Sequence, residues 1–360
     1  MDFTEDEMNR FALKPRDLLI CEGGEIGRTA IWSGQIEPCF HQNHIHRLRL
    51  LRGDVEPEFV MYWMQAAIRL LGLYEGEGNK TTIPNLSKAR LSKFLVPMPP
   101  LPEQRAIALT LHAVQGAREA RLREMALEKE RKAALMEHLF TKGTRGEATK
   151  TTEIGEMPES WKITKLGDVA KVRGGFAFKS DDYSKDGIPL LKISNVSFGK
   201  IIWEDISFLP DEYEHIYNQY LMKPNDLVMA ITRPVVAQGI KVSMLSEKDA
   251  PCFLNQRVCQ FIGGDSIKLT YLFYVIHNKY FIDSIINGAS GSQQPNISTT
   301  KVESISIGLP TSNEQNDITS ILAACDSKIS ALEHEARLLD ELFRSMLEEL
   351  MSGRLRRGRW

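Results

Sequence analysis

The sequence predicts an α+β protein: two mixed α/β domains, each followed by a long helix, with the two helices pairing as an antiparallel coiled coil. Three observations predict it. The chain repeats itself, each copy ends in a long helical pattern, and in each copy strand patterns come before a shorter inserted helix. Residues 84–141 match residues 295–352 without a gap, at a constant offset of 211 positions. A match this long indicates duplication.

The repeat is carried by short motifs at the same places in both copies. Pro84-Asn85-Leu86-Ser87 matches Pro295-Asn296-Ile297-Ser298, and Glu103-Gln104 matches Glu314-Gln315. Each motif pair is followed by a long helical run. Two similar modules, each ending in a long helix, indicate a protein that reads or holds two similar things at a fixed separation.

Strand patterns open each module. In the first copy, residues 14–32 predict a strand closed by a Gly-rich turn, residues 39–51 alternate between polar and apolar, and residues 57–74 predict a buried helix. The second copy repeats this order from Lys223 onward, with residues 269–282 as the inserted helix. Small changes in offset imply short insertions in loops, where they are well tolerated.

A coiled-coil seam is predicted in the long helices. Apolar residues recur with an unbroken 4-3 spacing from Ile318 to Leu350, and Ser312 with Gln315 resembles a capping box. The matching positions of the first helix are apolar at both ends and charged in the middle. The alternative is that each helix packs only on its own domain. The predicted seam and partner-docking residues are Ile107, Leu111, Val114, Leu135, Leu139, Ile318, Leu322, Ile329, Leu332, Leu339, Phe343 and Leu350.

The composition is typical of a globular protein. With 360 residues, a hydrophobic fraction of 42% and a formal net charge of −2, it has room for two domains plus connecting helices. No apolar run approaches the roughly 18–20 residues that span a bilayer, and the acidic start shows no signal peptide. Five cysteines without CxxC spacing fit reduced thiols. We expect a cytoplasmic protein without membrane contact.

The two copies differ at their openings. Ile154-Gly155 and Trp161 open the second copy, whereas the first copy lacks this segment because Met1 aligns with Pro210. We therefore expect the first domain to be less stable than the second. The expected parts are an N-terminally truncated first domain at 1–100, a long helix at 101–142, a polar, Gly- and Thr-rich linker at 143–153, a complete second domain at 154–311, a second long helix at 312–352 and a basic tail at 353–360.

These motifs, in this order, resemble the DNA-specificity (S) subunit of type I restriction–modification systems. The resemblance covers essentially the whole chain. Its strongest parts are Ile154-Gly155-x-x-Pro158-x-x-Trp161, Gly175-Phe176-Ala177-Phe178-Lys179, residues 187–193 and the doubled Pro-Asn-Leu/Ile-Ser. The resemblance implies two target-recognition domains, each reading one half of a split DNA sequence, and two helices that set the distance between them.

The resemblance also implies the partners. Double-stranded DNA and two modification (methylase) subunits would bind the chain, with restriction subunits joining indirectly; self-association or a complementing fragment would fill the missing opening. The chain itself would have no catalysis, no cofactor and no metal. Consistent with this, it contains no Gly-x-x-x-x-Gly-Lys loop and no Asn/Asp-Pro-Pro-aromatic box. The alternative is a truncated coiled-coil adaptor that binds partner subunits without bipartite sequence readout.

Candidate DNA contacts lie mainly in loops. Arg pairs with guanine and Asn or Gln with adenine in the major groove, while Lys, Ser and Thr also bond to phosphates. The loops at 76–82 and 288–296 differ in sequence between matching flanks, as expected for readers of two different half-sites; a plain surface connection is the alternative. The candidates are Arg28, Asn79, Lys80, Thr81, Lys179, Lys192, Asn195, Arg233, Gln238, Lys241, Ser290, Ser292, Gln293 and Gln294.

Three further patterns have a second interpretation. Cys39 to His46 resembles a metal-binding cluster, but the duplicated segment at 252–259 keeps Cys-Phe and loses every His, so we predict a strand with polar residues instead. Phe176 and Phe178 are expected in the core. The basic tail, with Arg354, Arg356, Arg357 and Arg359, either contacts phosphate or is a solvated end.

Overall fold

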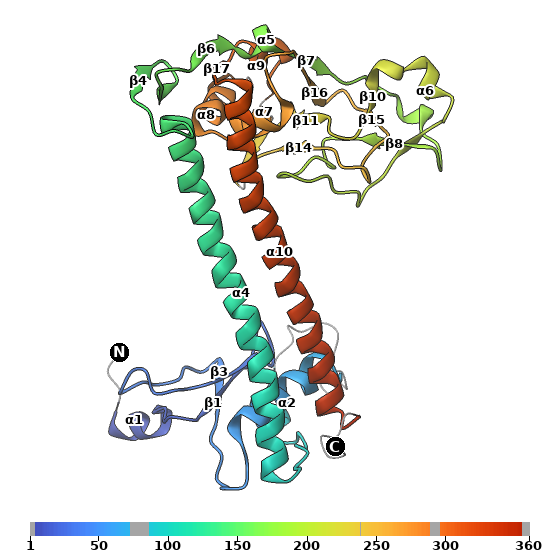
Figure 1. Cartoon of the computed structure of the whole chain (residues 1–360). Helices are drawn as coiled ribbons and strands as arrows, with labels where there is room; N and C mark the ends of the chain where they lie inside the picture. Colours follow the sequence, from blue (N-terminus) through green and yellow to red (C-terminus); the bar gives the residue numbers. More distant parts are fainter. Residues whose placement is uncertain (1–3, 73–85, 238, 289–295, 355–360) are drawn as a thin grey trace. The chain divides into compact units, whose positions relative to one another are not determined.

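The computed structural model describes residues 4–72, 86–237, 239–288 and 296–354, which fall into two compact units of mixed helix and sheet (Figure 1). Unit 1 comprises residues 1–127 and 329–360, and unit 2 comprises residues 128–328. Two long helices, α4 (Leu101–Lys142) and α10 (Ser312–Met351), each contribute a segment to both units. The α+β class predicted from the sequence is confirmed.

Unit 1 is built on a three-stranded antiparallel sheet of order β2-β1-β3. Its inserted helix starts with a proline in the first turn, where no backbone N–H is needed, and buries eight of its residues, including Tyr62 and Trp63. The unit's elements are α1 (Glu5–Phe11), β1 (Leu18–Cys21), β2 (Thr29–Ile31), β3 (Ile45–Leu48), α2 (Pro57–Arg69) and α3 (Lys88–Leu91).

Unit 2 repeats this sheet in the same register. Leu18 of β1 pairs with Ile31 and Leu48, and the matching Leu227 pairs with Met244 and Phe261. A fourth strand, β7, extends the unit 2 sheet beside β16. The elements of this part are β7 (Ala170–Gly174), β11 (Leu227–Ala230), β14 (Val242–Met244), β16 (Val258–Gly263) and α7 (Leu269–Ile276).

A second four-stranded sheet, of order β10-β15-β8-β9, lies in unit 2. Beside it Phe176, Phe178 and Tyr217 form an aromatic cluster with ring centroids 4.8–5.1 Å apart, so these phenylalanines pack inside as predicted. The elements are η1 (Ser180–Asp182), β8 (Ile188–Leu191), β9 (Phe208–Leu209), α6 (Tyr213–Ile216), η2 (Asn218–Tyr220), β10 (Leu221–Met222) and β15 (Cys252–Leu254).

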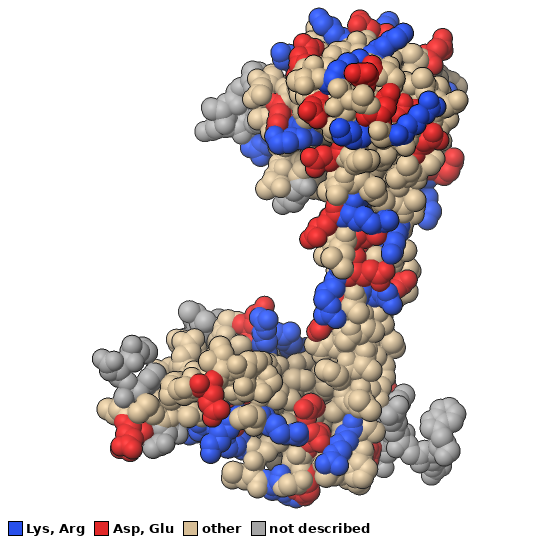
Figure 2. All heavy atoms as spheres, turned by 60° about the vertical axis from the view of Figure 1, so that its left-hand side comes forward, with Lys and Arg blue, Asp and Glu red and all other residues tan. Residues whose placement is uncertain are grey.

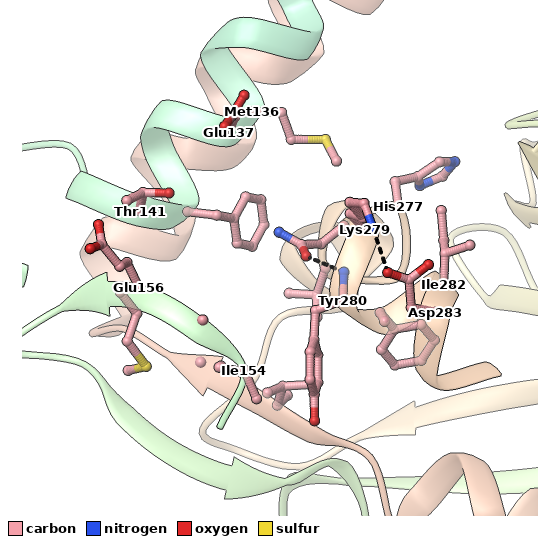
Figure 3. A pocket seen from close by; sticks show the side chains of 18 of the residues that line it. Met136, Glu137, Thr141, Ile154, Glu156, His277, Lys279, Tyr280, Ile282 and Asp283 are labelled. Carbon is pink, nitrogen blue, oxygen red and sulfur yellow. Dashed lines mark hydrogen bonds and ion pairs between the residues drawn. The ribbon is translucent and has the colours of Figure 1, made fainter. Parts of the chain in front are cut away.

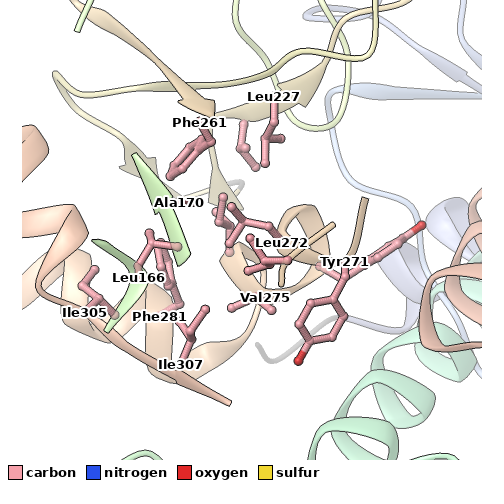
Figure 4. Packing of buried hydrophobic residues seen from close by; sticks show 14 of the residues in the cluster. Leu166, Ala170, Leu227, Phe261, Tyr271, Leu272, Val275, Phe281, Ile305 and Ile307 are labelled. Atoms are coloured by element: carbon pink, nitrogen blue, oxygen red, sulfur yellow. The ribbon is translucent and has the colours of Figure 1, made fainter. Parts of the chain in front are cut away.

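The main core of unit 2 joins the repeated sheet to helices around it (Figure 4). Tyr271 is fully buried, and its hydroxyl donates to the Gly308 carbonyl at 2.9 Å. Three two-stranded sheets and short helices complete the unit: β4 (Thr149–Thr152) with β5 (Gly155–Pro158), β6 (Lys162–Lys165) with β17 (Ser306–Leu309), β12 (Val235–Val236) with β13 (Gly239–Ile240), α5 (Leu166–Val169), α8 (Lys279–Gly288) and α9 (Thr299–Glu303).

Three local expectations are wrong. Within the predicted linker at 143–153, residues 149–152 form strand β4, which pairs with β5 in a hairpin, and Lys150 Nζ also donates to the carbonyls of Glu159 and Trp161 at 2.8 and 2.6 Å. The helix expected over 269–282 breaks at residues 277–278, because the side chain of Asn278 accepts the N–H of Tyr280 and starts α8.

The third expectation concerns the start of α10. Thr311, instead of Ser312, takes the capping position: its carbonyl accepts the N–H of Gln315 at 2.9 Å, and its hydroxyl lies 3.4 Å from the N–H of Glu314. The predicted capping box is absent from this described helix start, because the Gln315 side chain bonds to another segment of unit 2.

Within each unit, segments of α4 and α10 are joined by ion pairs. In unit 1 Arg118 contacts Asp340 at 3.0 Å and Arg121 contacts Glu335 at 3.1 Å. In unit 2 Lys132 contacts Asp326 at 2.5 Å and Glu128 contacts Lys328 at 3.9 Å. Residue numbers rise along one helix as they fall along the other, so the segments are antiparallel in both units. The charged middle of the first helix therefore supplies ion pairs to the seam.

The predicted seam residues are all buried or half-buried in the described structure. They complete the cores of the two units: Ile107, Leu111 and Leu350 pack in the unit 1 cluster, and Leu139, Ile318 and Leu322 pack in the unit 2 cluster. Of the helices described, none has the length and apolar content that a bilayer span requires.

Leu111 and Leu109 of α4 provide a matched test of the unit 1 core. Leu111 is fully buried, whereas Leu109 is 70% exposed. We expect Leu111→Ala to lower the free energy of unfolding by about 2–4 kcal/mol, because it leaves a cavity in the core. Leu109→Ala should change it by less than about 0.5 kcal/mol. Urea denaturation measures both, and equal losses would contradict the assignment of this helix face.

A buried ion pair gives unit 1 a pH dependence. The Asp17 side chain is 1% exposed and accepts from both the Arg49 guanidinium, at 2.5 and 2.6 Å, and the Lys14 N–H, at 2.7 Å. Burial raises the pKa of Asp17, but these hydrogen bonds outweigh burial and hold the pKa below its ordinary value. The stabilisation is therefore present above the ordinary Asp range and lost as the pH falls through the folded-state pKa.

We expect Asp17→Asn to lower the free energy of unfolding of unit 1 by about 2–4 kcal/mol at pH 7, less than for a fully buried pair because Arg49 is partly exposed. The difference from the native chain should shrink below about pH 4, where the unfolded-state carboxyl protonates. Asp226→Asn is the control, since Ile262 aligns with Arg49 in unit 2. Urea titrations at several pH values test this; a constant difference would refute it.

Candidate nucleic-acid interface

Each unit ties two predicted loops together at equivalent places. In unit 1 the carbonyl of Glu22, just after β1, accepts the N–H of Leu86 at 2.8 Å. In unit 2 the carbonyl of Ile231, just after β11, accepts the N–H of Ile297 at 2.9 Å, and Thr232 pairs with Asn296. The loop after the central strand therefore adjoins Leu86 in unit 1 and Asn296 and Ile297 in unit 2.

The first of these loops has a fixed backbone in each unit. Gly27 in unit 1 has a φ of +76°, and a Cβ there would lie 2.5 Å from the Ile68 side chain, so only glycine fits where this turn packs against α2. In unit 2 the loop continues into the β12–β13 hairpin, which the N–H of Lys241 closes by donating to the Pro234 carbonyl at 2.8 Å. Both loops are held by the fold at their ends.

Four predicted contact residues lie at or near the surface. Arg28 is exposed in the unit 1 loop, where its guanidinium contacts Glu25 at 3.0 Å. Arg233 is exposed in the unit 2 loop, and Lys241 is half-buried at the end of the hairpin. Lys179 is exposed before η1. Arg233 and Lys241 belong to one loop, whereas Lys179 lies on a different element.

Two predicted contact residues serve the fold instead. Asn195 is 1% exposed; its Oδ1 accepts the N–H of Lys192 at 2.9 Å and its Nδ2 donates to the Ile202 carbonyl at 2.9 Å. The Lys192 ammonium is bound by Asp205 at 2.8 Å and Ser207 at 3.1 Å. Their polar groups close a turn beside β8, because that turn must satisfy its buried backbone groups. We therefore leave both out of the proposed interface.

Several predicted contacts lie outside the described residues: Asn79, Lys80, Thr81, Gln238, Ser290, Ser292, Gln293 and Gln294, together with Arg356, Arg357 and Arg359 of the basic tail. Arg354 is described, and its guanidinium contacts Glu348 and Glu349 at the end of α10. Its charge is therefore partly compensated by the helix itself.

Charge does not mark the interface by itself. Figure 2 shows Lys and Arg interspersed with Asp and Glu over the described surface of the face in view, without one continuous basic area there. Sequence-specific readers also depend on a few side chains directed at base edges, so the loops, instead of a broad patch, define the candidate surface.

A cavity of about 800 Å³ lies in unit 2 between the end of α4, the β4–β5 hairpin and α8 (Figure 3). Its walls include Met136 and Tyr280, and carboxylates such as Glu137 and Glu156 stand around it. Its Lys279 contacts Asp283 at 2.7 Å. Apolar walls with carboxylates suit no phosphate backbone, so we do not assign DNA to this cavity.

Cysteine and histidine chemistry gives no site in the described parts of the chain, where no group of three or more potential metal ligands comes together. Burial raises the pKa of Cys252 and of Cys259 to about 12, so both thiols stay protonated and act as small apolar core residues. His41 packs edge-on against Phe11, with ring centroids 5.4 Å apart.

The sequence did not identify the hydrogen bonds that tie the paired loops. The available signal was the constant offset: Leu86 and Ile297 are 211 positions apart, and Glu22 and Ile231 are 209 apart. Leu86 and Ile297 keep an apolar type beside loops that change, so this pair is expected to anchor those loops, whereas Glu22 and Ile231 differ in type and take part through their backbone carbonyls. The β12–β13 hairpin was also missed, because its strands are only two residues long.

The chain is similar to known proteins of one family. A family model described as the type I restriction modification DNA specificity domain matches residues 2–127 and 158–342. The MjaVIII type I restriction enzyme specificity subunit of Methanocaldococcus jannaschii is 34% identical over 278 residues, 77% of this chain and 65% of that protein. The EcoAI specificity subunit of Escherichia coli is 32% identical over 166 residues, 46% of this chain and 28% of that protein. The matched part thus spans less than two thirds of either relative.

A solved structure is similar in fold. The crystal structure of a type I restriction–modification system S subunit from M. genitalium has a TM-score of 0.60 at 15% identity, covering 95% of this chain and 84% of that one. At this identity the likeness concerns the fold alone.

We expect Asn195→Ala to destabilise unit 2 by about 1–3 kcal/mol, because it leaves a buried N–H and a buried carbonyl without their partner. Lys200→Ala, an exposed change in the same turn, should leave the melting temperature unchanged. Thermal melts followed by circular dichroism compare the two. An Asn195 variant with native stability would return this residue to the candidate contacts.

Proposed function

We propose that this chain, which belongs to the type I restriction modification DNA specificity family, recognises a split DNA sequence, each unit reading one half. The observation that carries the proposal is the repeated scaffold: the same three-stranded sheet, in the same register, is followed in each unit by a loop that an equivalent backbone hydrogen bond anchors. Two copies of one scaffold with different loops suit two different half-sites.

The contacts proposed within the described residues are the loops after β1 and β11. Arg28 in unit 1 and Arg233 in unit 2 are exposed there, and arginine is the side chain most often used to read guanine. Lys241 and Lys179 would contact phosphates or base edges. The remaining predicted contacts, at 79–81, 238 and 290–294, lie outside the described residues and stay predictions from the sequence.

The two long helices are proposed to form one antiparallel coiled coil that docks two methylase subunits. The antiparallel ion pairs within both units and the buried seam residues support the pairing. Large apolar residues on the outer helix surface support the docking: Leu109, Leu127, Leu338 and Leu342 are each at least 46% exposed. In this proposal the chain itself performs no catalysis, and restriction subunits join through the methylases.

Methylome sequencing tests the readout. The chain is expressed with its methylase subunits in a host without other type I systems, and the modified positions are mapped. We expect one split motif, lost when this chain is omitted. Replacing residues 231–237 with the loop of a relative should change only one half of the motif. A complex that assembles but modifies without sequence preference would favour the adaptor alternative.

We expect Arg233→Ala to weaken binding of the specific duplex by about 1–3 kcal/mol, roughly 5- to 150-fold, and to relax preference at one base position. Lys241→Ala, if it removes a phosphate contact, should reduce the salt dependence by about one counterion without changing preference. Lys279→Ala, beside the carboxylate-lined cavity, is the control. Binding is measured by fluorescence anisotropy with the assembled complex; equal effects of all three would contradict the assignment.

Leu332 and Leu338 of α10 separate helix pairing from docking. Leu332 is 4% exposed and Leu338 is 47% exposed. We expect Leu332→Asp to lower stability by several kcal/mol, because it buries a charge in the seam. Leu338→Asp should keep the melting temperature but weaken methylase binding. Calorimetry and size-exclusion assembly assays measure these effects, and a Leu338 variant with native assembly would remove this surface from the docking proposal.

A further inference from the structure

A buried glutamine occupies the first turn of each long helix. Gln104 of α4 is 1% exposed, and Gln315 of α10, its equivalent in the repeat, is fully buried. Glutamine is mostly found at protein surfaces, so burial at both positions calls for partners for the whole amide group.

Those partners are the same in both units. Gln104 Oε1 accepts the N–H of Glu56 at 2.9 Å, while its Nε2 donates to the carbonyls of Asp54 at 3.1 Å and Pro99 at 2.8 Å. Gln315 Oε1 accepts the N–H of Lys268 at 2.9 Å, while its Nε2 donates to the carbonyls of Ser266 at 2.9 Å and Pro310 at 3.1 Å. Each partner of Gln104 aligns with a partner of Gln315.

The hydrogen bonds of each glutamine connect a long helix to the inserted helix of the same unit. Glu56 and Lys268 are the N-cap residues of α2 and α7, the inserted helices that pack on each repeated sheet. Pro99 and Pro310 stand just before the long helices. One amide therefore joins the start of the long helix, the start of the inserted helix and the segment that leads into it, and all three of its bonds are made inside protein.

Other contacts at these helix starts are not shared. Glu314 of unit 2 accepts from Trp161 Nε1 at 3.0 Å and from the N–H of Thr144 at 3.1 Å. Its equivalent in unit 1, Glu103, is half-buried, and the first copy has no counterpart of Trp161. We call the three hydrogen bonds of the Gln104 or Gln315 amide the glutamine clamp. Both units keep this clamp, although the contacts around it differ.

We propose that Gln104 and Gln315 are positioning residues that fix the angle at which each reading module meets its long helix, and thereby the half-site spacing that the complex accepts. The second part rests on the proposed function. Both side chains are buried, so neither contacts DNA. Their effect passes through α2 and α7 to the sheets that hold the loops, because a rigid base is what keeps loop residues in register with base edges.

The angle is tested without DNA in the full chain. Spin labels are introduced as unnatural amino acids at Ala324 in α10 and Lys200 in the unit 2 module, both exposed. Gln315→Leu is expected to broaden the distance distribution between the labels. Leu191→Ala, a buried change in a separate cluster of unit 2, lowers stability without touching the clamp and should keep the distribution narrow. A narrow distribution in Gln315→Leu overturns the proposal.

Spacing is tested with the methylase-bound complex on a library of both half-motifs separated by spacers of different length. Modification of off-length spacers, relative to the preferred one, should rise by about tenfold in Gln104→Leu and Gln315→Leu, the factor that one hydrogen bond at the upper end of its net range represents. The half-motifs themselves should stay unchanged. A native spacer profile in these variants, or the same shift in Leu191→Ala, overturns the proposal.

Two further outcomes are decisive. If Gln315→Leu does not fold, Gln315→Glu is used, which keeps the shape and the acceptor but loses the Nε2 donors. A narrow label distance distribution or a native spacer profile in Gln315→Glu then overturns the proposal. If the labels show a loosened angle while the native complex modifies no split motif, the proposed function fails and the positioning role stands.

Discussion

Each unit depends on burial of a long-helix segment in its own core. Leu111 and Leu350 complete the unit 1 cluster, and Leu139 and Leu322 complete the unit 2 cluster. The three-stranded sheet and single covering helix of unit 1 form a small body, so the apolar long-helix residues are a sizeable addition to its core. Segments of both helices therefore act as core elements of the two units.

The charged middle of α4 forms ion pairs that specify how its residues align with those of α10. A seam that is apolar throughout would leave register weakly specified, whereas the Arg118–Asp340 and Lys132–Asp326 pairs match in only one alignment. Such partly exposed pairs contribute little stability each. These ion pairs disfavour alignments in which one helix is shifted along the other. Burial of the apolar residues near the helix ends contributes most of the free energy that stabilises the pairing.

In the loops, too, some contacts fix the structure while other residues can vary. Strand pairing and the backbone bonds of Leu86 and Ile297 fix where each loop starts and ends. Apart from packed positions such as Gly27, residues of the loops after β1 and β11 can change without disturbing the core, because loops tolerate substitution and insertion. A duplicated scaffold can in this way present two different surfaces, which is what reading two different half-sites requires.

The sequence by itself determined the duplication, the order of strands and helices, the seam and the inward aromatics, because these are carried by spacing and apolar periodicity. It did not determine which polar residues lie inside. Asn195 was predicted as a DNA contact and closes a buried turn, residues 149–152 were assigned to a linker and form a strand, and Gln315 was predicted as a capping residue but bonds to another segment. Each outcome depends on partners brought close by the fold, such as Ser266 and Lys268 for Gln315, and a local pattern holds no information about partners some 50 residues away along the chain.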